Sequence, residues 1–122
     1  MPAVASILVS VATHNARGGG DDQIQLTEHL DREPAVFEVE LASDAPVAVS
    51  FNGMAAVSVV KLESVDAKVR ARLTSADGVA PVPVDPVACV VSRSVPFTAL
   101  DLTRVAGGPT VRVRVTLGAP ET

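Results

Sequence analysis

The sequence predicts an all-β protein: a single antiparallel β-sandwich (jelly-roll-like) of about eight or nine short strands. Three observations predict this class. Apolar and polar residues alternate with a period of two along most of the 122-residue chain, the apolar residues are mostly Val and Ala, and Gly, Pro and Asp separate the alternating segments. Such alternation places one row of side chains in an interior and the other in solvent. No segment carries a helical repeat over three turns.

In the first half of the chain, the alternation predicts strands at residues 6–12, 23–30, 36–41, 47–51 and 57–62. Between the first two, His14–Asp22 contains Gly18-Gly19-Gly20 and is expected to be a mobile loop, because glycine permits positive φ. Pro34 ends the second strand, and Asn52-Gly53 closes the fourth with a strong turn signal. Residues 57–62 are apolar on both faces, so we expect a central strand there.

In the second half, strands are predicted at residues 68–73, 87–91, 97–102 and 111–117, with turns at Asp77-Gly78 and Gly107-Gly108-Pro109. Three prolines in residues 80–86 predict an extended connector, because proline cannot donate a hydrogen bond to a ladder. Cys89 is the single cysteine, so no intrachain disulfide forms. Its apolar neighbours predict a short buried strand and a buried, unreactive thiol.

The length suits one domain spanning residues 1–122, within which residues 1–13 are expected to form a strand that pairs between subunits. The N-terminal segment resembles a signal peptide only superficially. No Lys or Arg precedes its apolar stretch, and Ser6 and Ser10 interrupt that stretch. We therefore expect synthesis in the host cytoplasm without export. No apolar run reaches the roughly 18 residues of a membrane helix, so no membrane partner is expected.

Charge is unevenly distributed along the chain, whose net charge is −4. Residues 1–60 carry two basic and eight acidic side chains, whereas residues 61–122 carry eight and six. The bases fall mainly on the expected outward faces of two strands. Such rows either form a solvated face that blunts strand edges, or let the basic half of one subunit meet the acidic half of the next. The residues assigned to an assembly interface are Ile7, Val9, Val11, Lys68, Arg70, Arg72, Arg112 and Arg114.

The chain carries little that suits catalysis. His14 and His29 stand outside metal-binding motifs, and a site joining them with Asp21, Asp22 and Glu28 is a minor alternative to solvated loop residues. Gly18-Gly19-Gly20-Asp21 lacks the Lys-Ser/Thr of a phosphate loop. Glu38 and Glu40 share one strand face, where surface placement is far commoner than glycosidase chemistry. We expect no enzymatic activity, no cofactor and no bound metal.

Nucleic acids and sugars are also poor candidates for a ligand. Their binding sites usually contain exposed aromatic rings, and this chain has no Trp, no Tyr and three Phe at expected core positions. A net negative charge disfavours duplex binding. No sequence-specific nucleic-acid partner is expected.

Four phrases in the sequence carry a resemblance to a known class of proteins. They are residues 51–54, 69–78, 95–103 and 111–118, the last two reading VPFTALDLT and VRVRVTLG. In these four phrases the chain resembles small β-sandwich structural proteins of tailed bacteriophage and prophage virions. The likeness covers about residues 46–118 and leaves the first 45 residues unmatched.

The resemblance implies a non-enzymatic virion protein that decorates the capsid or belongs to the tail, neck or baseplate. It implies assembly as a homo-oligomer, with itself and other virion structural proteins as partners, and it supplies no catalytic residues. Two other readings stay open. One is a small ligand- or protein-binding β-sandwich adaptor that uses residues 14–22 as a recognition loop. The other is an enzyme or metal-binding jelly roll.

Overall fold

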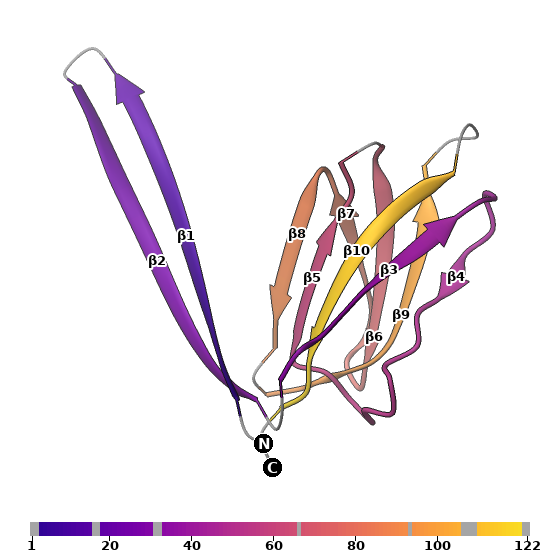
Figure 1. Ribbon diagram of the computed structural model, residues 1–122. Coiled ribbons are helices and arrows are strands. Elements are labelled where there is room, and N and C mark those ends of the chain that lie inside the picture. The colour runs from indigo at the N-terminus through magenta and orange to yellow at the C-terminus, as the bar shows by residue number, and fades with distance from the viewer. Residues whose placement is uncertain are drawn as a thin grey trace.

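The computed structural model shows an eight-stranded β-sandwich from which a long two-stranded ribbon extends (Figure 1). It describes the backbone of residues 3–15, 18–30, 33–65, 67–92, 94–105 and 110–120, and side chains from residue 30 onward. These parts of the chain are strands and their connections, with no helix among them. The prediction of an all-β, antiparallel sandwich is therefore confirmed.

The ribbon is an antiparallel hairpin made of β1 (Ala3–Asn15) and β2 (Gly18–Leu30), paired along their full length. At about 3.3 Å per residue, each 13-residue strand is about 43 Å long. The expectation of a mobile loop at His14–Asp22 is wrong for most of that segment. Gly18, Gly19 and Gly20 belong to β2, because they pair with the last three residues of β1.

Two four-stranded antiparallel sheets form the sandwich. The first sheet has the order β3 (Ala35–Leu41), β10 (Val111–Gly118), β5 (Val59–Glu63) and β8 (Val87–Val91). The second sheet has the order β4 (Val47–Ala48), β9 (Phe97–Arg104), β6 (Val69–Ser75) and β7 (Gly78–Val84). Strands β3, β5, β6, β9 and β10 lie where the alternation predicts strands. Strand β7 occupies the segment expected to be a connector, so that expectation is wrong.

The strand pairs are nested in the sequence. Strand β3 pairs with β10, β4 with β9, β5 with β8 and β6 with β7. Two further pairings, β5 with β10 and β6 with β9, complete the two sheets. As a result, the first and last strands of the sandwich lie side by side, and its middle forms the tight β6–β7 hairpin.

The alternating valines and leucines fill the space between the sheets. Along β6 and β10 the burial alternates residue by residue, as the sequence predicts. Each such side chain contributes about 1.5–3 kcal/mol when fully buried. The largest fully buried side chains in the sandwich are Leu41, Leu62, Leu73, Leu100, Leu102, Leu117, Val57, Val60, Val69, Val84 and Val113.

The turn between β4 and β5 matches its sequence signal. Asn52 and Gly53 both have positive φ, at 52° and 83°, and the Met54 amide donates to the Phe51 carbonyl at 3.0 Å. The strand predicted over residues 47–51 is shorter than expected, because only Val47 and Ala48 pair as a regular strand.

Candidate functional site

The root of the ribbon is anchored in the sandwich. Leu30, the last residue of β2, is fully buried and pairs with Pro120 in an antiparallel bridge. A Cβ placed on Gly118 would lie 2.9 Å from both terminal methyl groups of Leu30. Any larger residue at this position of β10 would therefore force the end of the Leu30 side chain to shift. The two residues together fix where the ribbon leaves the sandwich.

Beyond this root the ribbon diverges from the sandwich (Figure 1). Directly opposed residues of an antiparallel pair share one face, so the register defines the two faces of the ribbon. Ile7 opposes Leu26, and Val9 opposes Ile24. The centre of one face thus collects apolar positions, with Glu28 and Asp22 toward its two ends. The other face carries mostly polar positions, among them Ser6, Thr27, Ser10 and Gln23, with Leu8 between them. Three expected interface residues, Ile7, Val9 and Val11, lie on the apolar face.

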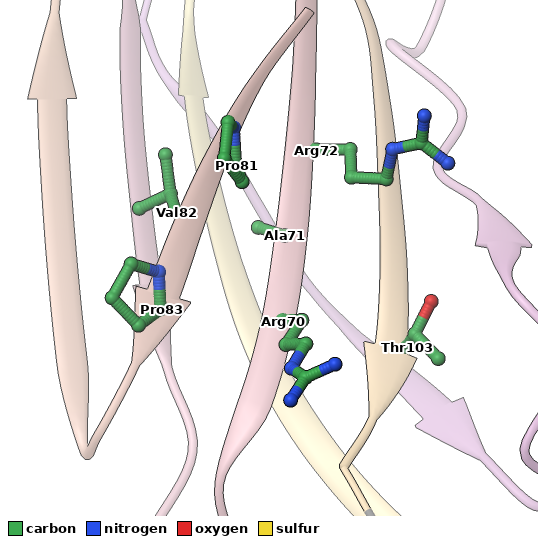
Figure 2. Close-up of a pocket in the computed structure, with 7 residues that line it drawn as sticks. All are labelled: Arg70, Ala71, Arg72, Pro81, Val82, Pro83 and Thr103. Carbon is green, nitrogen blue, oxygen red and sulfur yellow. The ribbon is translucent and has the colours of Figure 1, made fainter.

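A shallow groove of about 380 Å³ lies on the outer surface of the second sheet. Arg70 and Arg72 of β6 line it, with Pro81 and Pro83 of β7 on one side and Thr103 of β9 on the other. Figure 2 shows the Arg72 side chain extending from β6 across β9, away from the prolines, while the Arg70 side chain lies in front of β6.

Charge makes this groove suitable for an anionic group. Arg72 stands opposite Asp101 in the register, but within the part of the chain that the structure describes, no ion pair includes Arg70 or Arg72. A guanidinium binds a carboxylate or phosphate with two parallel hydrogen bonds. Two such groups spaced two residues apart, with the Thr103 hydroxyl nearby, can hold an acidic segment against β6.

The outer surface of the first sheet has a different character, because its charges neutralise one another. Arg112 of β10 lies 3.4 Å from Glu40 of β3, and Lys61 lies 3.0 Å from Glu63 on β5. Arg114 stands in the register between Glu38 on one side and Glu63 on the other. Exposed pairs of this kind contribute about 0–1 kcal/mol each, so they make the surface neutral more than they stabilise it.

The two basic rows expected from the sequence therefore lie on opposite outer faces of the sandwich. Arg70 and Arg72 belong to the second sheet, and Arg112 and Arg114 to the first, so they cannot contact one flat partner together. Lys68, just before β6, lies 3.7 Å from Asp85 and is exposed.

Sequence reasoning missed one ion pair with a nearly buried partner. The Arg104 Nε donates to the Asp44 carboxylate at 2.7 Å, and only 9% of the Arg104 side chain is exposed. The residues are 60 positions apart, and no local pattern signals such a long-range pair.

Cys89 corrects a sequence expectation. It was expected to be buried in a short buried strand, but β8 is an edge strand of the first sheet and Cys89 is exposed. Partial burial raises the pKa of its thiol, and the positive charge of Lys61, its partner in the register, opposes that rise. Because the net shift of the pKa is upward, the surroundings of Cys89 do not activate its thiol as a nucleophile.

The five residues considered for a metal site fall into two groups along the ribbon. His14, Asp21 and Asp22 belong to its far half, whereas Glu28 and His29 lie near its root. Because β2 is extended, Asp22 and His29 stand about 23 Å apart along it. The side chains of all five lie outside the described ones. Among the described side chains no group of three His, Cys, Asp or Glu could hold a metal ion, and no buried polar atom lacks a hydrogen-bond partner.

The comparisons with known proteins add no relative. No family model, curated protein or solved structure matches the chain. Within the described residues there is no helix that is long and apolar enough to cross a membrane.

Proposed function

We propose that this protein is a non-enzymatic structural subunit of a phage or phage-like particle, either a capsid decoration or a component of the tail, neck or baseplate. The observation that carries the proposal is the ribbon of β1 and β2. It leaves the sandwich at Leu30 and collects apolar positions on one face. A two-stranded ribbon is at best marginally stable in water by itself, so it gains most from a partner that covers it.

The sandwich suits the same role. We interpret its nested strand pairing as a jelly-roll topology, which viral capsid proteins also use. The resemblance of residues 46–118 to phage β-sandwich proteins falls on this body, and the unmatched first 45 residues contain the ribbon. A compact body with a projecting arm is consistent with a subunit that docks on a shell or tube. The virion is the proposed location.

Self-association tests the proposal first. Val9→Lys places a charge on the apolar face of the ribbon, and Ser10→Lys places the same charge on the polar face as a matched control. Sedimentation velocity over a wide concentration range should show oligomers for the wild type and for Ser10→Lys. Val9→Lys should remain monomeric, and thermal unfolding should show that its sandwich is intact. Equal assembly of all three proteins would contradict a role for the apolar face.

Location in a particle needs its own test. Particles purified from a lysate of the host should contain the chain at a stoichiometry of many copies, and electron microscopy with a labelled antibody should place it on the head or tail. Absence of the chain from every particle fraction would contradict the virion role.

The groove on the second sheet favours one alternative, a small ligand- or protein-binding adaptor. Arg70 and Arg72 would then bind an acidic segment of another protein. A monomer at all concentrations, together with loss of binding to an acidic peptide on Arg70→Ala and Arg72→Ala substitution, would favour the adaptor over the assembling subunit.

A further inference from the structure

The sandwich has four edge strands, and edges are where sheets recruit further strands. They are β3 and β8 in the first sheet and β4 and β7 in the second. Soluble proteins protect such edges with prolines, charges or very short strands, because unpaired N–H and C=O groups otherwise bind other strands.

Three of these edges carry such protection. Strand β7 contains Pro81 and Pro83, which have no N–H to offer a partner at these two positions. Strand β4 has only two paired residues. Strand β3 carries Glu38 and Glu40, both exposed. Adding an uncharged strand to β3 or β7 would cost free energy, because of the charges on β3 and the missing N–H groups on β7.

Strand β8 has none of these devices. Val87–Val91 contains no charge and no proline, and its five residues pair in full with β5 on the other side. Val87 is 52% exposed, and Cys89 is exposed. This strand is therefore the unprotected edge among the four.

The ladder shows which backbone groups of β8 are free to pair. At one end the Ser64 amide donates to the Pro86 carbonyl at 2.7 Å, and at the other the Ser92 amide donates to the Ser58 carbonyl at 2.8 Å. Hydrogen-bonded pairs alternate along an antiparallel ladder, so the even-numbered residues of β8 bond to β5. The N–H and C=O groups that point away from β5 belong to Val87, Cys89 and Val91.

We propose that β8 is the acceptor edge for β1 of a second copy of this chain, which adds β1 to the first sheet by strand pairing. This inference rests on the proposed self-assembly and names the surface that receives the ribbon. Strand β1 is the suitable donor, because Ala3–Asn15 contains no Asp, Glu, Lys or Arg. Its partner β2 carries Asp21, Asp22 and Glu28.

The donor comes from a second copy because the ribbon diverges from β8 of its own chain (Figure 1). Leu30 is fully buried at the root, which holds the ribbon in that direction. The 13 residues of β1 exceed the five of β8, so one donor strand can cover the whole acceptor edge. Main-chain hydrogen bonds then supply affinity, as in other strand-addition complexes.

Cys89 allows a direct test in the wild-type chain, because it is the single cysteine and lies in the middle of the acceptor edge. Its labelling by a thiol reagent is measured across the concentrations at which assembly occurs. We expect labelling to slow about tenfold or more on assembly, since the edge is then covered. Val9→Lys should keep labelling fast at every concentration.

Two substitutions at one position provide a matched pair. Cys89→Pro removes an outward N–H, as the prolines of β7 do, whereas Cys89→Ala keeps it. We expect Cys89→Pro to raise the midpoint concentration of assembly about tenfold or more and Cys89→Ala to leave it near that of the wild type. Val87→Lys, a charge on the same edge, should act like the proline, and thermal unfolding shows whether each variant keeps its fold.

The outcomes separate this inference from the proposed function. If the wild type assembles while Cys89 labelling stays constant and Val87→Lys assembles normally, β8 is not the acceptor, and the assembly role stands. If the wild type never assembles, the intermolecular strand pairing fails together with the proposed self-assembly. If Cys89 is protected at all concentrations and Val9→Lys exposes it in a monomer, the ribbon covers β8 of its own chain, which overturns the intermolecular pairing.

Discussion

Replacing Leu30 with Ala is expected to lower the free energy of unfolding by about 2–5 kcal/mol, the range for removing a fully buried leucine side chain. Leu30 is 0% exposed although it ends a strand of the ribbon, and it contacts the position of Gly118 on β10. The truncation leaves a cavity at the root of the ribbon, because the backbone bridge to Pro120 holds the two segments in place.

A second substitution tests whether the contact between Leu30 and Gly118 causes this loss of stability. In the wild type, Gly118→Ala introduces a Cβ 2.9 Å from two methyl groups of Leu30, and such overpacking costs about 1–3 kcal/mol. With Leu30→Ala the same Cβ enters the vacated space. Alanine also restricts the unfolded chain relative to glycine, which contributes about 0.4–1 kcal/mol of stability. Gly118→Ala should therefore be neutral or stabilising in that background.

The assay is urea unfolding of the wild type, both single variants and the double variant, at a concentration where each is monomeric. The midpoints at constant m give the four free energies of unfolding. We expect a coupling of at least about 1 kcal/mol between the two positions. Additivity within about 0.3–0.5 kcal/mol would refute the reasoning, since residues in contact at a close-packed root cannot act independently.

Four further outcomes test the rest of the molecule. Leu100→Ala, at a position 1% exposed between the sheets, should lower the free energy of unfolding by about 2–5 kcal/mol in the same assay, and a loss below 0.5 kcal/mol would argue against the packed interior. Lys61→Ala removes the charge that opposes the raised pKa of Cys89, so thiol labelling at mildly alkaline pH should slow; faster labelling would contradict that cause. Because the folded thiol has the raised pKa, stability should be constant at lower pH and fall as pH rises above the pKa of the unfolded thiol. The double substitution Pro81→Val and Pro83→Val gives β7 two outward N–H groups, and light scattering should then report more aggregation than for the wild type.

The half-buried strands were predictable because their periodicity is local information. Residues 111–117 alternate Val or Leu with Arg or Thr, and β10 buries one row and exposes the other as expected. Asn52-Gly53 likewise specifies its turn through backbone preferences that need no partner. For such segments the sequence pattern and the tertiary environment agree.

The edges were not predictable, because pairing partners decide them. Pro81 and Pro83 indicate a connector when read locally, yet an edge strand accepts prolines whose nitrogens point outward. Gly18-Gly19-Gly20 indicates a loop, yet pairing with β1 continues the strand through it. Cys89 sits in an apolar run typical of a core strand, and only the long-range order of the first sheet shows that this run lies at its edge.

For the candidate surfaces, too, local features were predictable and features that depend on strand order were not. Alternation alone places Arg70 and Arg72 on an outward face, which the structure bears out. That they lie on the opposite face of the sandwich from Arg112 and Arg114 depends on which strands share a sheet, and so does the neutralisation of Arg112 by Glu40. A single sequence contains no direct information on which strands share a sheet or on which charges pair between strands.

Amide hydrogen exchange of the intact chain at low and high protein concentration tests the intermolecular strand pairing most directly. We expect the amides of β1 and those of Val87, Cys89 and Val91 to gain protection together as concentration rises, with the β7 edge unchanged. Exchange in both segments that stays independent of concentration, in a sample that sediments as a monomer throughout, would contradict the idea that the arm of each molecule extends the sheet of the next.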